Sequence, residues 1–468
     1  MTVSADSESN ANDNRPAGRV LRRSGFTIAA DGSYAACLAE AEPLAGGAEG
    51  AADDGPPDPG AAGGGLWFPE RWTLDGPEPY AVPLPGTQPE EPGTQVLPLS
   101  DGRVLIMRRV ADRHDLALLY PAGPGTGELP VCSLPGTEVR LLPPPPGSGT
   151  AYALVRDDSP DDAEGRTAIW RVHDTAADGT PARVTTVRGR CTGGVWLDRT
   201  GRLLALDREL GGRTKAVAAD LHTGEVSPLL QLTEDSDDRL LVAEPDSGLL
   251  LLRSDATGEA RLGWGVLGSR HPVRFPDALV VPGALLTPVA AQPGQILSPE
   301  SCVVALRAEV PGGAESLALW RPGERRLHWR ASPAGWLRGA AVWLPGAELC
   351  LPYAAPDWPC GLLAYGMPAA EAEAEVDAES ESGPAIAHPA EAAPVQESGT
   401  AARFVAGAPA AVRGGPPSPP LSRGGGNSGG TRRRGLGFGP AAAGGAPLGR
   451  PLSVLPLQQA PLAAAQAG

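Results

Sequence analysis

One complete four-stranded β-meander is predicted for residues 193–232, GGVWLDRTGRLLALDRELGGRTKAVAADLHTGEVSPLLQL. Its four apolar runs are separated by short turns that contain Asp and Gly, the residues that tight turns prefer. Pro228 in the last run indicates an edge strand, because proline has no amide to donate to a neighbouring strand. An isolated meander is only marginally stable and leaves two unpaired edges. We therefore expect this unit to pack against copies of itself.

The same order of strand, turn and strand recurs along the chain. Six further copies are placed at residues 25–85, 94–136, 137–189, 235–276, 277–333 and 334–368, and the last of them ends after three strands. Four antiparallel strands in about 40 residues are typical of one β-propeller blade. The fold is therefore predicted to be all-β, a β-propeller with seven blades, and six blades are the alternative.

Composition sets the expected limits of the propeller at residues 19–368. Residues 1–18 are polar, and residues 44–64 form an insertion rich in Gly, Ala, Pro and Asp, so both are expected to be disordered. Residues 369–447 have low complexity, with an acidic block followed by a basic one. This segment is also expected to be disordered.

An apolar run, PLSVLPLQQAPL, interrupts this composition within residues 448–468. We expect it to return to the propeller as the missing outer strand of the seventh blade and so to close the ring. Arg19–Arg23 is the competing candidate for that position. The remaining alternative is that the C-terminal segment pairs with nothing.

Three of the copies share a turn that is followed by an apolar strand: Asp31-Gly32-Ser33-Tyr34-Ala35, Asp101-Gly102-Arg103-Val104-Leu105 and Asp198-Arg199-Thr200-Gly201-Arg202-Leu203-Leu204. This order resembles the propellers of the TolB type and of the N-terminal domain of prolyl oligopeptidases, over residues 25–368. The chain departs from both. TolB-type proteins are exported with a signal peptide, whereas residues 1–18 have neither its basic nor its apolar region. Prolyl oligopeptidases carry a C-terminal hydrolase domain, whereas low-complexity sequence follows Pro368.

Charge narrows the classes of partner. The formal net charge is −16, which disfavours nucleic acid and anionic membranes as partners of the ring. No apolar run reaches the length of a membrane-spanning helix. We expect a cytoplasmic protein whose partner is another protein. Ser422–Gly437 resembles arginine-glycine segments that contact RNA, but the preceding acidic block can neutralise it.

No catalytic, cofactor-binding or metal-binding residue is assigned, and no cofactor is expected. The GxSxG match at Gly426–Gly430 lacks the strand and helix that a nucleophile elbow needs. The acidic stretches Asp157–Gly165 and Asp235–Asp238 lack the ligand spacing of a calcium loop and are interpreted as solvated loops. The histidines form no HxH or HExxH motif; they are His114, His173, His222, His271, His328 and His388.

Cysteines and tryptophans are assigned to the core. No two cysteines form a CxxC motif, so they are expected to be reduced and buried, with a Cys350–Cys360 disulfide or a metal site as the alternative. Five tryptophans in strand-like runs are expected to pack between blades: Trp196, Trp264, Trp320, Trp336 and Trp343. Proline-rich surroundings predict that Trp67, Trp72 and Trp358 are exposed.

The function expected from these observations is that of a non-catalytic, TolB-like scaffold for protein interaction. The first alternative is a propeller enzyme or small-ligand-binding protein with its site in the central channel. The second is a relative of prolyl oligopeptidases that lacks the catalytic domain. Acidic and histidine side chains that meet at one channel mouth would favour the first alternative.

Overall fold

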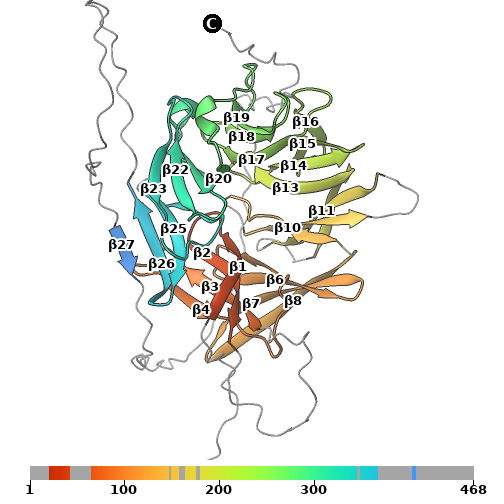
Figure 1. Cartoon of the computed structure of the whole chain (residues 1–468). Coiled ribbons are helices and arrows are strands. Elements are labelled where there is room, and N and C mark those ends of the chain that lie inside the picture. Colours follow the sequence, from red (N-terminus) through yellow and green to blue (C-terminus); the bar gives the residue numbers. More distant parts are fainter. Residues whose placement is uncertain are drawn as a thin grey trace, which may run out of the picture. The chain divides into compact units, whose positions relative to one another are not determined.

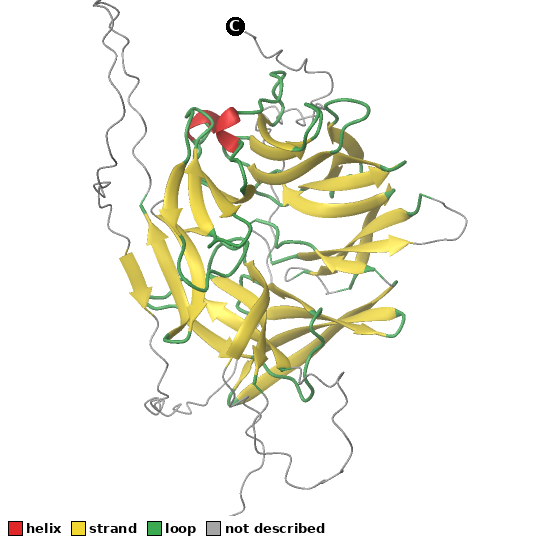
Figure 2. Ribbon diagram, in the orientation of Figure 1, coloured by secondary structure: helices red, strands yellow, loops and turns green. Residues whose placement is uncertain are grey.

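The structure is a computed structural model that describes residues 20–42, 65–136, 138–146, 149–157, 164–174, 180–344, 348–366 and 403–406. Within these ranges the regular structure is β, apart from the short 3-10 helices η1 (Asp277–Leu279) and η2 (Pro299–Ser301). Seven antiparallel sheets follow one another around a ring (Figures 1 and 2). The predicted seven-bladed β-propeller is therefore confirmed.

Sheets 1 to 4 each contain four consecutive strands. Sheet 1 consists of β1 (Val20–Ile28), β2 (Tyr34–Ala41), β3 (Leu66–Thr73) and β4 (Tyr80–Pro83). Sheet 2 consists of β5 (Gln95–Pro98), β6 (Val104–Val110), β7 (Arg113–Ala122) and β8 (Gly125–Pro135). Sheet 3 consists of β9 (Val139–Leu141), β10 (Ala151–Asp157), β11 (Arg166–His173) and β12 (Ala182–Arg188). Sheet 4 consists of β13 (Arg190–Trp196), β14 (Leu203–Leu210), β15 (Arg213–Asp220) and β16 (Val226–Leu230).

Sheets 5 to 7 are less uniform. Sheet 5 has three strands in the described chain, β17 (Asp238–Glu244), β18 (Leu249–Ser254) and β19 (Arg261–Val266). Sheet 6 consists of β20 (Leu285–Ala291), β21 (Val304–Glu309), β22 (Ser316–Trp320) and β23 (His328–Ala331). Sheet 7 consists of β24 (Val342–Leu344), β25 (Glu348–Ala355), β26 (Trp358–Tyr365) and β27 (Arg403–Ala406).

Apolar side chains fill every junction between neighbouring sheets. Leu38 of sheet 1 packs in one cluster with Ile106 of sheet 2, and equivalent clusters follow at each later junction. The cluster between sheets 7 and 1 contains Trp72, which is fully buried, and Leu362. Burial of one such large side chain contributes about 1.5 to 3 kcal/mol. Because the last sheet packs on the first in this way, the ring is closed.

The Asp turns seen in the sequence have one common geometry. Oδ1 of Asp31 accepts the amide of Ser33 at 3.1 Å, and Oδ1 of Asp101 accepts the amide of Arg103 at 3.0 Å. Oδ1 of Asp198 accepts the amide of Thr200 at 2.7 Å. These side-chain bonds to the residue two positions on replace a backbone turn bond. They fix the tight connection between the first two strands of sheets 1, 2 and 4.

The outer edge of sheet 7 differs from the expectation. Its fourth strand, β27, comes from within residues 369–447 and pairs with β26, with Leu363 opposite Phe404. The competing candidate, Arg19–Arg23, falls largely in β1, which pairs with β2 in sheet 1. The segment 448–468 lies outside the described residues, so its expected pairing stays a prediction, but β26 already has a partner along its edge.

Candidate functional site

The outer edge of sheet 5 carries only one bridge to the following segment. Trp264 of β19 donates its amide to the carbonyl of Arg274 at 2.9 Å and accepts the amide of Arg274 at 3.0 Å. In this antiparallel register, Leu262 would face Pro276. Proline has no amide to donate, and the chain enters η1 directly after Pro276. No backbone hydrogen bond between described residues continues this ladder past Trp264 towards Leu262.

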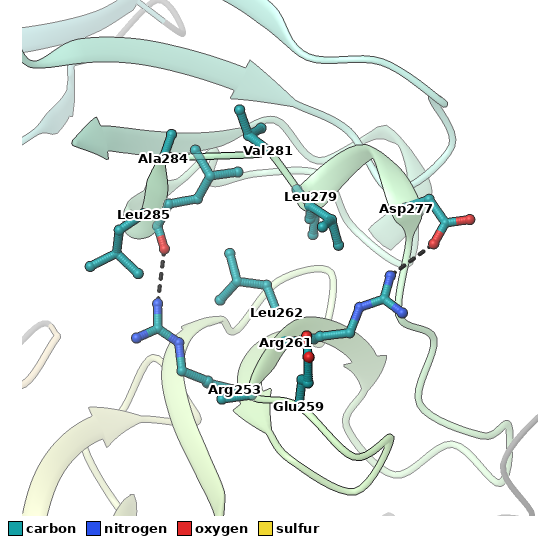
Figure 3. A pocket seen from close by; sticks show the side chains of 12 residues that line it. Arg253, Glu259, Arg261, Leu262, Asp277, Leu279, Val281, Ala284 and Leu285 are labelled. Carbon is teal, nitrogen blue, oxygen red and sulfur yellow. Dashed lines mark hydrogen bonds and ion pairs between the residues drawn. The ribbon is translucent and has the colours of Figure 1, made fainter. Parts of the chain in front are cut away.

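A groove of about 630 Å³ lies beside this open edge, between β19, η1 and the start of β20. We call it the β19 groove (Figure 3). Leu262, Leu279 and Leu286 form its buried floor. Val280 and Leu285 lie at its rim, and each has about half of its surface exposed, 51% and 50%. Its volume falls in the usual range of ligand-binding sites.

Polar contacts hold the two sides of the β19 groove together. Arg253 of β18 donates to the carbonyl of Leu286 at 2.9 Å, and Arg261 of β19 donates to Oδ1 of Asp277 at 2.8 Å. Figure 3 shows these two contacts on opposite sides of the apolar floor. The Asp277 side chain is almost fully exposed, at 99%. Exposed ion pairs contribute little to stability, so this contact offers little resistance to a ligand that enters from the side of η1.

A second candidate region lies along the central channel. The first strands of successive sheets lie next to one another, as β1 does with β5 and β13 does with β17, so these strands line the channel. The arginines with exposed surface on these strands include Arg140 of β9, Arg190 of β13 and Arg239 of β17. Each is held by a neighbour: Arg140 donates to the carbonyl of Gly193 at 2.8 Å, Arg190 to Oε1 of Glu138 at 2.7 Å, and Arg239 to Oγ1 of Thr214 at 3.0 Å.

Asp207 is a second acidic group in this region, close to Arg239 and Arg140. Its side chain is buried, Oδ1 accepts the amide of Leu240 at 3.0 Å, and Oδ2 lies 3.9 Å from Nη1 of Arg239. Burial raises the pKa of Asp207 to about 6, although the Leu240 amide and the charges of Arg239 and Arg140 act in the opposite direction. A carboxyl group with such a pKa changes its protonation state close to neutral pH, which is typical of functional sites but not restricted to them.

A smaller cavity of about 320 Å³ is formed by β1, β5 and β9 on the same channel wall. Ser24, Thr27 and Arg140 contribute polar atoms to it. Gln95 also lines it, but its side chain bridges two sheets: Nε2 donates to the carbonyl of Val139 at 3.0 Å, and Oε1 accepts the amide of Leu141 at 2.8 Å. Arg140 is therefore the charged group that this cavity offers.

The two acidic stretches singled out in the sequence have different outcomes. The interpretation of Asp235–Asp238 as a solvated loop is wrong for Asp238, which has no exposed surface and pairs with Lys215. In the other stretch, residues 158–163 lie outside the described residues, and Glu164 pairs with Arg188 at 2.6 Å. Neither stretch therefore provides a described cation site.

Histidines and the remaining motifs add no described site. Within the described ranges, no group of three or more His, Cys, Asp and Glu side chains converges as a metal ion requires. His388, the GxSxG match at 426–430 and the arginine-glycine segment at 422–437 lie outside the described residues. The described part of the chain also contains no helix that is long and apolar enough to span a membrane.

The tryptophan expectations hold in part. Trp196, Trp264, Trp320 and Trp336 are buried, Trp343 is half-buried, and Trp358 is exposed. The prediction that Trp67 and Trp72 are exposed is wrong, because both are buried in β3. The guanidinium of Arg22 covers the Trp67 ring at 5.0 Å, and Nε1 of Trp72 donates to Oε2 of Glu70 at 3.0 Å.

All six cysteines are free thiols, so the Cys350–Cys360 disulfide is absent from the structure. Five are buried and Cys132 is half-buried. Burial raises the pKa of Cys132 and of Cys191 to about 11. The thiolate is the nucleophilic form of cysteine, and a raised pKa disfavours it. We therefore assign Cys132 and Cys191 to packing in the hydrophobic core.

The known proteins whose structures are similar to this chain share little sequence with it. No protein-family model matches the chain, and neither does any curated protein. TolB from Acinetobacter baumannii has 13% sequence identity and a TM-score of 0.37, over 64% of this chain and 73% of that one. A puromycin hydrolase has 16% identity and a TM-score of 0.42, over 76% of this chain and 54% of that one.

The acylaminoacyl peptidase of Pyrococcus horikoshii gives a similar result. Its identity is 12% and its TM-score 0.42, over 74% of this chain and 51% of that one. The chain thus spans about half of the length of these two enzymes. It is a seven-bladed β-propeller whose fold is similar to those of TolB and of peptidases with a propeller.

Proposed function

We propose that the protein is a non-catalytic interaction scaffold, and that the β19 groove binds an extended segment of a partner protein. The observation that carries this proposal is the open edge of β19 at Leu262, directly beside the exposed Val280 and Leu285. The other edge of β19 is paired with β18 in a continuous ladder. A segment that binds at Leu262 would therefore extend a formed sheet.

In strand addition of this kind, the backbone and the side chains of the bound segment have different roles. Hydrogen bonds to an unpaired strand edge contribute affinity, and pockets for alternate side chains contribute specificity. The apolar floor of Leu262, Leu279 and Leu286 selects aliphatic or aromatic side chains on the bound segment. Burial of Val280 and Leu285 by a partner would also remove apolar surface from water.

The test is affinity capture from the lysate of the native host, with mass spectrometry, using the full chain and two variants. Val280→Glu/Leu285→Glu places two charges at the groove rim. Leu129→Glu is the matched control, because Leu129 is also 51% exposed but lies on β8 of sheet 2. We expect a stoichiometric protein that is captured by the wild type and the control and lost with the rim variant. Equal capture by all three would contradict the assignment to the groove.

A second candidate function, binding of a small anionic ligand in the channel, is favoured by Arg140 and Asp207. Arg140 supplies charge to the cavity on the channel wall, and the pKa of Asp207 near 6 makes this region sensitive to pH. Thermal shifts with a panel of small carboxylates and phosphates would test it. A shift that disappears in Arg140→Met but persists in the rim variant would favour the channel over the groove.

A further inference from the structure

A cavity of about 580 Å³ lies at the seam where sheet 7 meets sheet 1. It is bounded on one side by Val20, Arg22 and Arg23 of β1, and on the other by the connection before β24 and the β25–β26 hairpin. We call it the seam cavity. We propose that it binds a small carboxylate with an apolar body, which the guanidinium groups of Arg22 and Arg23 recognise. It shares no described lining residue with the β19 groove, so this proposal does not depend on the function proposed for that groove.

Arg23 is a buried cation that is fixed in one orientation. Its side chain is only 7% exposed. Its Nε donates to Oε2 of Glu70 at 2.6 Å, and its Nη2 donates to Oε1 at 3.1 Å. Glu70 is itself held, because Oε2 also accepts Nε1 of Trp72 at 3.0 Å. A guanidinium that is paired at two points is restricted to one plane, so a ligand does not have to immobilise it.

Terminal amino groups of both arginines remain available to a ligand. Nη1 of Arg23 donates to no acceptor among the described residues, and Glu70, which engages the other two nitrogens, is not a lining residue of the cavity. Arg22 pairs with Glu40 through Nε, and its two Nη groups have no acceptor in the described chain either. The Arg22 side chain is 67% exposed and lies over the Trp67 ring at 5.0 Å.

The charges around the seam cavity favour a carboxylate as the acceptor. The amino groups of a guanidinium match the oxygens of carboxylates and phosphates. None of the described residues that line the cavity is acidic, but each arginine already has one carboxylate partner, Glu40 or Glu70. Repulsion from these two groups grows with the charge of the ligand, so a single negative charge is favoured over the higher charge of a phosphate.

The wall opposite the arginines selects an apolar body. Its larger side chains are aliphatic or proline rings: Leu337, Ala354, Ala355, Pro356 and Pro359. Backbone hydrogen bonds fix this wall, because Ala354 donates its amide to the carbonyl of Gly335 at 3.0 Å and Leu337 donates to the carbonyl of Pro352 at 2.9 Å. The volume lies in the usual range of small-molecule sites. The site is therefore formed before a ligand enters it.

A ligand in the seam cavity would contact the two sheets at which the ring closes. β1 lies near one end of the described chain and β25 near the other, and the apolar cluster between their sheets contains Trp72 and Leu362. A ligand that binds the folded state alone stabilises that state. Binding here would therefore strengthen the closure of the ring.

The experiment is isothermal titration calorimetry of the full chain with octanoate, and with octanamide as its uncharged counterpart. We expect octanoate to bind at one site and octanamide to bind about tenfold more weakly. Arg23→Lys keeps a positive charge for Glu70 but removes Nη1, so it should bind octanoate about tenfold more weakly than the wild type. Ala355→Trp should abolish binding by filling the cavity while both arginines remain. Arg140→Lys makes the same exchange at the channel wall and should bind like the wild type.

Three results would overturn the proposal. They are no binding of octanoate at millimolar concentration, equal binding of octanamide, and wild-type affinity in Ala355→Trp. The last variant leaves the ion pair of Arg23 with Glu70 intact, so it decides the question even if Arg23→Lys does not fold. Loss of binding in Arg140→Lys with none in Arg23→Lys would place the ligand in the channel and would also overturn the proposal.

Hydrogen exchange supplies an independent readout of the position of the ligand. At about ten times the Kd of octanoate, we expect amides in residues 353–358 to exchange about tenfold more slowly, while those of β8 stay unchanged. Slower exchange in residues 260–266 instead would contradict the assignment to the seam cavity. Val280→Glu/Leu285→Glu should bind octanoate like the wild type, so failure here leaves the proposed function of the β19 groove untouched, and failure there leaves the seam cavity untouched.

Discussion

Nζ of Lys215 lies 2.9 Å from Oδ2 of Asp238, and this contact joins β15 of sheet 4 to β17 of sheet 5. Lys215 is the only lysine in the chain. The Asp238 carboxylate also accepts the Ser254 hydroxyl at 2.6 Å and the Leu232 amide at 2.9 Å. With all of these donors, a fully buried charge is compensated at the junction between two sheets.

Lys215→Met is expected to lower the free energy of unfolding by about 3 to 5 kcal/mol, because it leaves the Asp238 carboxylate buried without its counter-charge. Denaturation with guanidinium chloride would measure the change. The control is Arg202→Met, which breaks an ion pair with Asp220 at the surface and should have a much smaller effect. Similar losses in the two variants would contradict the role assigned to Lys215.

Titration of Asp207 should make the free energy of unfolding depend on pH. Its pKa in the folded protein is raised to about 6, so the folded state binds the proton more tightly than the unfolded state does. This contribution to stability is present below about pH 4 and is lost as the pH rises to about 6. Asp207→Asn should therefore gain about 2 to 3 kcal/mol relative to the wild type between pH 4 and pH 7.

Asp220→Asn should change the pH dependence of stability in the opposite direction. Its hydrogen bonds to Arg202 lower the pKa of Asp220, so the charged form stabilises the fold and that stability is lost at acid pH. Unfolding free energies of both variants and the wild type at several pH values would test the pair. A difference for Asp207→Asn that does not change with pH would refute the raised pKa.

Gly335 and Gly339 form a matched pair in the connection before β24. Both have positive φ, +77° and +76°. A Cβ added at Gly335 would lie 2.0 Å from the carbonyl oxygen of Ala354, whereas a Cβ added at Gly339 would have no other atom within 4 Å. Gly339→Ala should cost about 1 kcal/mol from backbone strain alone. Gly335→Ala should cost about 3 kcal/mol or more, because the backbone must also move. Thermal denaturation of both variants would reveal the difference.

Replacement of residues 403–406 by Gly-Ser-Gly-Ser should expose the edge of β26. Four residue pairs join β26 to β27, and pairs of this kind contribute about 0.2 to 1 kcal/mol each, so we expect a loss of about 1 to 3 kcal/mol. The same replacement at residues 412–415 serves as the control. Hydrogen exchange should rise in β26 with the first replacement and stay unchanged with the second.

Local patterns in the sequence were sufficient to predict the blades. Alternation and Asp turns depend on residues a few positions apart, and Asp31, Asp101 and Asp198 all cap turns as expected. The burial of Trp67 and Trp72 was not predicted, because their proline-rich surroundings suggested exposure. It depends on the position of β3 inside sheet 1, where β2 and β4 cover both of its edges.

The candidate site could not be predicted for a similar reason. The open edge at Leu262 results from the register that pairs Trp264 with Arg274 and so sets Pro276 opposite Leu262. Pro276 is visible in the sequence, but the register is not. Likewise, the pairing of β27 with β26 joins Phe404 to Leu363 across a long stretch of low complexity, and short apolar segments alone do not specify such a partner.

The order of the sheets around the ring follows the order of the strands in the chain, and sheets 7 and 1 meet through side chains such as Trp72 and Leu362. Strand pairing within each sheet therefore does not depend on where the polypeptide starts. A circularly permuted gene that begins between sheets 4 and 5, with the original ends joined, would encode the same seven sheets. The chain would then run directly from sheet 7 into sheet 1. The new chain ends would lie between sheets 4 and 5, where Lys215 contacts Asp238.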